Sequence, residues 1–233
     1  MSMFILKAGL VLVLGLLMVR SALLVHPKPA PAQAVRIMPL GDSITYGVDD
    51  RTHDSPSGGY RNILLRELPN VIMVGSVKDS ATNSVLDNEG HRAWTIRQMN
   101  EQATTWCKSA NPDIVLVHAG TNDLAREVGP NMAAIRLRGF IQTLLNSSHA
   151  KIYVASLVPI LPKNSANADA ERFTIFDRLI PGVVASFAST GRVSFVDMTA
   201  EKWSASDYGS TGVHLRPSGY AKMAHAWEVS LCR

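Results

Sequence analysis

The chain has 233 residues, 46% hydrophobic and 18% charged, a composition that excludes intrinsic disorder and allows one well-buried core. Its formal charge of +4 arises mainly at the N-terminus, where Lys7, Arg20 and Lys28 are not balanced by any acidic residue up to position 34. The rest of the chain is nearly neutral and has no cluster of Lys and Arg, so we exclude nucleic acid as a partner.

The N-terminal segment has the features of a secretory signal. Lys7 precedes an apolar run at residues 8–19, and Arg20 follows it. The run is shorter than the roughly 20 residues that span a bilayer, and small residues in the Pro/Ala-rich stretch at 27–34 offer a cleavage site. We expect residues 1–34 to be signal peptide and linker, and the protein to be secreted without stable membrane association. The alternative is an uncleaved signal that anchors it.

Strand and helix patterns alternate through the remaining domain, residues 35–233. Apolar runs predict buried strands at 36–40, 71–75, 113–118, 151–157 and 192–198. Helical patterns occupy 60–68, 94–106, 131–145, 171–189 and 218–231, and Pro181 is expected to kink or divide the fourth. This alternation predicts an α/β fold, a three-layer α/β/α sandwich around a five-stranded, parallel, doubly wound sheet.

Four residues are expected in loops at the carboxyl edge of this sheet, where such folds bind ligands: Ser43, Gly90, Asn122 and His214. Ser43 follows the first strand, and its hydroxyl is a candidate nucleophile. His214 precedes the last helix and is suited to act as the base that removes the proton of this hydroxyl. The N–H groups of Ser43 and Gly90 and the amide of Asn122 are candidate donors to an oxyanion. Taken singly, each position also fits an ordinary capping residue or turn glycine.

The order of these motifs resembles the SGNH (GDSL) hydrolase superfamily. The blocks are Gly41-Asp42-Ser43-Ile44, Gly90, Gly120-Thr121-Asn122-Asp123 and His214. The segment Asn88-Glu89-Gly90-His91-Arg92-Ala93-Trp94-Thr95-Ile96 resembles the His-Glu-Gly-His-Ser-Gly-Trp-Thr-Ile segment of carbohydrate esterase family 3, which includes acetylxylan esterases. The resemblance implies a flavodoxin-like fold, Ser43 as nucleophile, His214 as base, and Ser43, Gly90 and Asn122 as oxyanion donors.

One departure from the family concerns the third catalytic residue. The family has Asp three residues before the histidine, whereas this chain has Thr211. Asp207 is the nearest preceding acid, and a Thr hydroxyl is also able to accept the imidazole N–H. The sequence therefore offers Asp207 or Thr211 as the third member.

These features predict a secreted serine esterase that removes acetyl or other short acyl groups, on a carbohydrate or a small ester. The alternatives are a lipid esterase or lysophospholipase, and a non-hydrolytic secreted carbohydrate-binding protein on the same fold. We expect a monomer without a cofactor, and the histidine spacing offers no set of metal ligands. Export and an even cysteine count favour a disulfide between Cys107 and Cys232.

Overall fold

The computed structural model describes residues 33–232 except 54, 56, 79–85 and 162–166. Nearly all of the expected signal peptide and linker lies outside the described residues. The described residues belong to one compact unit, which begins at Gln33 and contains every element below. Within this described part, no helix is both long enough and apolar enough to cross a membrane.

A parallel sheet forms the centre of this unit. Its main strands run in the order β2-β1-β4-β5-β6, and a sixth strand, β3, pairs with the end of β1 at Leu40↔Glu89 and Gly41↔Gly90. The strands are β1 Val35–Gly41, β2 Val71–Met73, β3 Glu89–Gly90, β4 Ile114–His118, β5 Lys151–Ala155 and β6 Val193–Val196. The α/β prediction is confirmed, with β3 added to the five expected strands.

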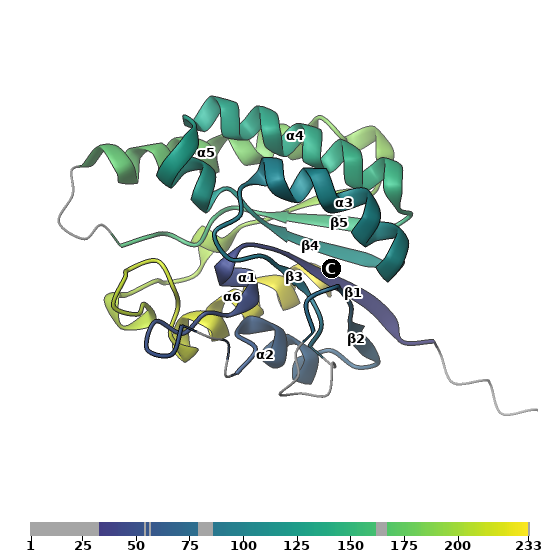
Figure 1. The fold of residues 1–233 in the computed structure, drawn as a ribbon, viewed down its shortest axis with the longest axis horizontal. Coiled ribbons are helices and arrows are strands. Elements are labelled where there is room, and N and C mark those ends of the chain that lie inside the picture. Colours follow the sequence, from purple (N-terminus) through teal and green to yellow (C-terminus); the bar gives the residue numbers. More distant parts are fainter. Residues whose placement is uncertain (1–32, 54, 56, 79–85, 162–166, 233) are drawn as a thin grey trace, which may run out of the picture. The chain divides into compact units, whose positions relative to one another are not determined.

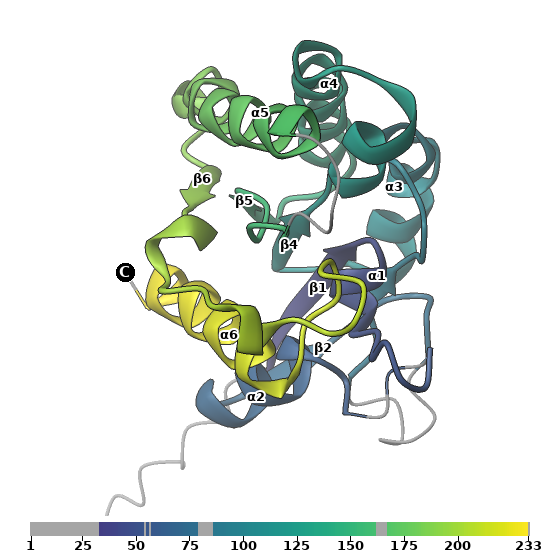
Figure 2. The ribbon, with the colours of Figure 1, turned by 90° about the vertical axis from the view of Figure 1, so that its left-hand side faces the viewer.

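Helices cover both faces of the sheet (Figure 1). Those on one face are α3 Ile96–Ala110, α4 Pro130–Ser147 and α5 Asn167–Ala185; those on the other are α2 Tyr60–Glu67 and α6 Pro217–Leu231, as Figure 2 also shows. Short turns of helix are α1 Ser43–Tyr46, η2 Asp123–Glu127, η3 Ala188–Thr190, η4 Met198–Ala200 and η5 Ala205–Asp207. Helix α5 runs on past Pro181 as one element.

Successive side chains along a strand point to opposite faces of the sheet, and this alternation produces two hydrophobic cores. In β1, Met38 and Leu40 pack into the cluster beneath α3, α4 and α5, while Ile37 packs into the cluster beneath α2 and α6. All three side chains are at most 1% exposed. The sheet is therefore buried on both sides, and its polar groups meet solvent chiefly at the ends of the strands.

The two cysteines lie on opposite faces of the sheet. Cys107 is buried in α3, whereas Cys232 follows α6 and is exposed, and both are free. Since α3 and α6 belong to different layers, the predicted disulfide is wrong.

Candidate active site

Ser43 lies at the point where β1 ends and α1 begins. Asp42 caps this short helix, because its Oδ1 accepts the Ile44 N–H at 2.9 Å. Gly41 is needed for the tight turn, since a Cβ there would lie 2.3 Å from the carbonyl oxygen of His118. Asp42 is fully buried, and this burial raises its pKa to about 6. The Ser43 hydroxyl is thus held at the rim of the sheet above a buried carboxyl group.

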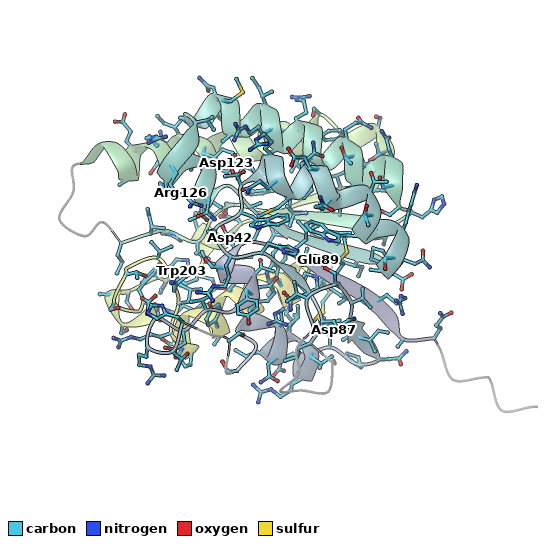
Figure 3. All side chains as sticks on the ribbon, viewed as in Figure 1. Asp42, Asp87, Glu89, Asp123, Arg126 and Trp203 are labelled. Carbon is cyan, nitrogen blue, oxygen red and sulfur yellow. The ribbon has the colours of Figure 1, made fainter. Side chains whose placement is uncertain are left out.

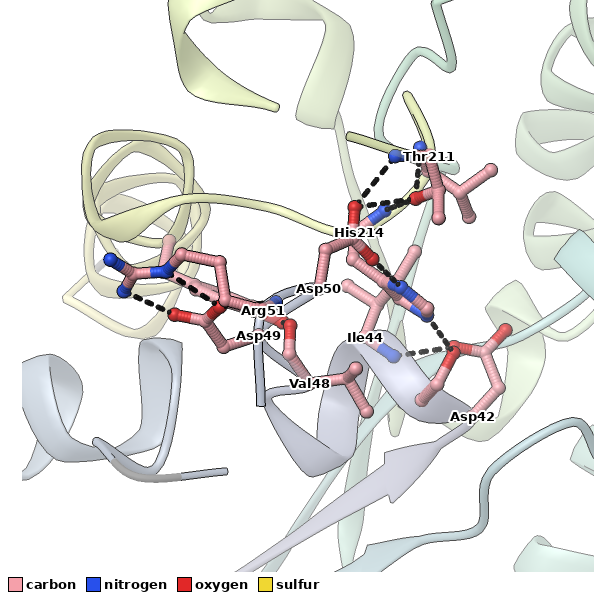
Figure 4. A network of polar contacts seen from close by, with 11 residues as sticks. Asp42, Ile44, Val48, Asp49, Asp50, Arg51, Thr211 and His214 are labelled. Atoms are coloured by element: carbon pink, nitrogen blue, oxygen red, sulfur yellow. Dashed lines mark hydrogen bonds and ion pairs between the residues drawn. The ribbon is translucent and has the colours of Figure 1, made fainter. Parts of the chain in front are cut away.

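His214 connects Ser43 to a carboxylate. Its Nε2 lies 2.9 Å from Ser43 Oγ, and its Nδ1 lies 2.5 Å from Asp50 Oδ1 (Figure 4). Asp50 comes from the loop after α1, and its side chain is 3% exposed. Ser43, His214 and Asp50 therefore form a continuous hydrogen-bonded chain of the kind that activates a serine hydroxyl.

Asp50 is held in this place by the loop that carries His214. Its Oδ2 accepts the Thr211 N–H at 2.7 Å and the Thr211 Oγ1–H at 2.8 Å. The loop must approach closely, since a Cβ at Gly209 would lie 2.4 Å from Asp50 Oδ2. Burial tends to raise the pKa of Asp50, but the hydrogen bonds from Thr211 and His214 outweigh it and lower the pKa. Asp50 thus remains a carboxylate beside the imidazole.

Neither sequence candidate for the third residue occupies the position beside His214 Nδ1. Thr211 contacts Asp50 and the His214 backbone N–H, at 3.3 Å, and so supports the carboxylate rather than replacing it. Asp207 forms an ion pair with Lys222 and caps η5 by accepting the Ser204 N–H at 2.8 Å. Both candidates were wrong. They lie in the same loop as His214, whereas the carboxylate comes from Asp50 in the loop after α1.

Gly90 is also placed differently from the prediction. Its N–H donates to Asn88 Oδ1 at 2.8 Å, so it is not directed at Ser43. The glycine serves packing instead, because a Cβ there would lie 2.4 Å from the Tyr46 nitrogen. Ala93 lies in the cavity wall with Ser43, in the left-handed region at a φ of 66°. Its N–H has no hydrogen-bond partner among the residues described.

Asn122 follows β4 and faces the same cavity. Its Nδ2 donates to the Trp94 carbonyl at 2.9 Å and lies 3.4 Å from Asp42 Oδ2, a long contact. Its Oδ1 accepts from Arg126 Nη2 at 2.9 Å, which fixes the orientation of the amide. The donor side of Asn122 therefore faces Trp94 and Asp42, and the residue lines the same cavity as Ser43.

The loop that carries Ala93 is anchored by an aromatic stack. The His91 ring lies between Trp94 and Trp106, with ring centroids 4.4 and 4.6 Å away. His91 Nε2 also contacts Glu89 Oε2 at 2.8 Å, and Glu89 is buried in β3. These contacts hold the loop that carries Ala93 against β3 and α3.

A second anchor holds the loop of Asn122. The fully buried Asp123 accepts the first N–H of α3, from Ile96, at 2.7 Å, and a hydrogen bond from Arg136 of α4 at 2.8 Å. Figure 3 labels Asp123 and Arg126 on the side of the sheet covered by α3–α5 and Asp42 near the end of β1.

A cavity of about 470 Å³ opens in front of the serine. It is lined by Ser43, Arg92, Ala93, Thr121, Asn122, Ala125, Arg126, Ile160, Phe173, Thr211, Val213 and His214. The cavity thus brings together Ser43, Asn122, Thr211 and His214, four of the six residues that the sequence offered for the site. Sequence reasoning missed Asp50 and Ala93. A signal for Ala93 was present, because the family segment has glycine at that position.

Comparisons with known proteins identify the family of this chain. The model of the GDSL-like lipase/acylhydrolase family matches residues 40–222. A family 3 carbohydrate esterase from Clostridium thermocellum is 30% identical, with a TM-score of 0.71 over 84% of this chain and 94% of that one. A family 3 carbohydrate esterase from Talaromyces cellulolyticus has the same TM-score at 20% identity, over 85% of this chain and 96% of that one, which shows the fold alone.

A longer curated relative is the multidomain esterase of Ruminococcus flavefaciens, which is 28% identical over 84% of this chain. This chain spans only 28% of that relative's length. The family match covers most of the chain and includes the loops that hold Ser43, Asn122 and His214. The chain therefore belongs to the GDSL-like lipase/acylhydrolase family, a family of carboxylic ester hydrolases.

Proposed function

We propose that this protein is a serine esterase that hydrolyses acetyl or other short acyl esters carried on carbohydrate. The observation that carries the proposal is the chain from Asp50 through His214 to Ser43, which ends at an open cavity. Similarity to family 3 carbohydrate esterases supports a carbohydrate substrate.

The reaction begins when Ser43 Oγ bonds to the ester carbonyl carbon and its proton passes to His214 Nε2. The carbonyl electron pair moves to oxygen, and the Ser43 and Ala93 N–H groups and Asn122 Nδ2 stabilise the resulting oxyanion. As the C=O bond reforms, the alcohol oxygen leaves with the proton from His214. The acyl group is then bonded to Ser43.

Water completes the cycle by the same route. It gives a proton to His214 Nε2 as its oxygen bonds to the acyl carbon, and the Ser43 oxygen leaves and takes that proton. The products are a carboxylic acid and the free serine. Asp50 stays ionised throughout, orients the imidazole and stabilises the imidazolium. It supplies the carboxylate that the family has three residues before the histidine and that this chain lacks at Thr211.

The nucleophile is tested by labelling with a fluorophosphonate. An adduct on Ser43, found by peptide mass spectrometry and absent from Ser43→Ala protein, is the expected result. Folded wild-type protein that takes up no label would contradict the esterase mechanism.

The acyl group is tested with a series of 4-nitrophenyl esters. We expect kcat/KM to be highest for acetate and to fall beyond butyrate. A preference for chains of eight carbons or more would instead support the lipid esterase alternative. Against that alternative, the apolar lining is short, with Ile160, Phe173 and Val213 as its larger members.

We also propose that residues 1–34 direct export. The support is the sequence pattern alone: Lys7, the apolar run at 8–19 and the small residues before position 35. N-terminal sequencing of protein recovered from the culture medium should find a start between residues 31 and 36. Recovery only as a membrane-bound chain that retains Met1 would instead support the uncleaved anchor.

A further inference from the structure

The charged side chains that line the cavity in front of Ser43 are positive. Arg92 and Arg126 line it, and none of the described residues lining it carries a carboxylate. The two nearby acids, Asp42 and Asp50, are buried behind the reacting groups, with Asp42 0% exposed and the Asp50 side chain 3% exposed. A ligand that enters the cavity therefore meets positive charge on its wall.

Arg126 is fixed at the edge of the candidate oxyanion donors. Its Nη2 donates to Asn122 Oδ1 at 2.9 Å and to the Ala93 carbonyl oxygen. The side chain is exposed, and its Nε and Nη1 have no partner among the residues described. One edge of the guanidinium thus holds the protein, and the remaining N–H groups are available to a ligand.

Arg92 lies on the loop between β3 and α3, next to Ala93. It is exposed, and no hydrogen bond or ion pair is found for it in the described part of the chain. Its side chain is thus free to follow a ligand held against Arg126. Planar guanidinium groups bind carboxylates through paired N–H donors, so two of them on one wall favour an anionic substrate group.

The neighbouring cavity does not share this bias. Ile160 and Phe173 also line a second cavity of about 430 Å³, whose charged lining residues are Asp177, Arg178 and Asp197. The unbalanced positive charge therefore belongs to the cavity in front of Ser43.

We propose that this esterase prefers acyl esters on sugars that bear a carboxylate, that is, on uronic acid residues, and that Arg92 and Arg126 bind that carboxylate. The inference rests on the proposed function and adds the charge of its substrate. The anion belongs to the alcohol portion, because an acetyl or other short alkyl acyl group carries no charge.

The preference is tested with two substrates that differ only at C6. They are methyl glucopyranoside and methyl glucopyranosiduronate, each carrying one acetyl group on the same hydroxyl. We expect kcat/KM to be roughly tenfold higher for the uronate at low ionic strength and the ratio to fall in 0.5 M NaCl, because salt screens the exposed arginines. Equal or lower kcat/KM for the uronate would overturn the proposal.

Variants assign the preference to the two side chains. Arg92→Gln should lower the uronate-to-glucoside ratio about fivefold, and Arg92→Lys should restore part of it. Arg126→Gln should lower the ratio too, while also reducing kcat for both esters through Asn122. The control is Arg66→Gln, an equal loss of charge at an exposed position in the last turn of α2. A ratio that falls equally in the control would show a net-charge effect and refute a binding site.

Hydrolysis of the neutral glucoside ester distinguishes failure of the uronate preference from failure of the proposed esterase function. Hydrolysis of the neutral glucoside ester without a uronate preference would leave the esterase function standing and remove the inference. If neither ester is hydrolysed, the function fails, and binding decides the inference. Titration of Ser43→Ala protein with methyl glucuronoside and methyl glucoside should still show tighter binding of the anion, and equal affinities would overturn it.

Discussion

Asp50 Oδ1 lies 2.5 Å from His214 Nδ1, although 164 residues separate the two in the chain. The family pattern places this carboxylate three residues before the histidine, where this chain has Thr211. Here the acid comes from the loop after α1, and Thr211 donates two hydrogen bonds to it. The same carboxylate–imidazole contact is therefore made by a residue of a different loop.

The first prediction concerns that carboxylate. Asp50→Asn should lower kcat by about 10⁴ for 4-nitrophenyl acetate, the loss seen when the triad acid of a serine protease becomes an amide. Asp49→Asn is the matched control, because the Asp49 carboxylate points away and pairs with Arg51 at 2.7 Å (Figure 4). Asp49→Asn should keep nearly full activity. If the two variants had similar kcat values, Asp50 would not be the third member.

The second prediction concerns Thr211. Thr211→Asp should lower kcat by tenfold or more, because a second carboxylate would face Asp50 Oδ2 in place of a donor. Thr211→Val removes only the hydroxyl and should cost less. An increase in kcat for Thr211→Asp would mean that Asp50 does not serve the histidine in solution.

The sequence predicts more of the fold than of the candidate site. The five main strands and five longer helices were predictable because each has a long apolar or amphipathic pattern. Strand β3 was not, since two residues, Glu89 and Gly90, in a polar stretch carry no periodicity. Ser43, Asn122 and His214 were found because each lies near the end of a strand or the start of a helix.

The missed residues depend on how loops fold against each other. Asp207 was one of two candidates because it is the nearest acid before His214 in sequence, yet its carboxylate pairs with Lys222. Nothing local to Asp50 indicates that Gly209 and Thr211 fold over it. Gly90 was a candidate oxyanion donor, but the lack of a side chain there serves the close approach of the Tyr46 backbone.

A third prediction uses the glycine beside Asp50. Gly209→Ala would place a Cβ 2.4 Å from Asp50 Oδ2, so the carboxylate must move from His214. We expect kcat to fall at least tenfold while the far-UV circular dichroism is unchanged. Gly139→Ala in α4 is the control, since nothing lies within 4 Å of a Cβ there. It should keep its activity and gain up to about 1 kcal/mol of stability. Normal kcat in Gly209→Ala would refute the close approach.

The fourth prediction concerns two proposed oxyanion donors, Asn122 and Ala93. Asn122→Ala should lower kcat by about 10²–10³, the cost of losing one donor. Ala93→Gly keeps the N–H and relieves the left-handed φ of 66°, so it should leave the chemistry intact and raise stability by about 0.5–1 kcal/mol. Denaturant unfolding and 4-nitrophenyl acetate kinetics measure the two effects. A loss of stability in Ala93→Gly would contradict the strained conformation.

The last prediction assigns Asp207 to stability. Burial tends to raise the pKa of Asp207, but hydrogen bonds from Lys222 and Ser204 outweigh it and lower the pKa to about 2 from 3.8. A carboxyl group with a lowered folded-state pKa stabilises the fold fully above its unfolded value, and this contribution is lost as the pH falls through 2.

Asp207→Asn should therefore cost about 1–3 kcal/mol at pH 7, and its stability should converge with that of the wild type as the pH falls from 4 towards 2. Its kcat should stay within about twofold, because Asp207 serves Lys222 and not His214. Glu101→Gln, which breaks an exposed pair with Arg97, should cost less than about 0.5 kcal/mol at either pH. Urea unfolding at pH 7, 4 and 2.5 measures these differences. A large fall in kcat with unchanged stability would return Asp207 to the catalytic chain and displace Asp50.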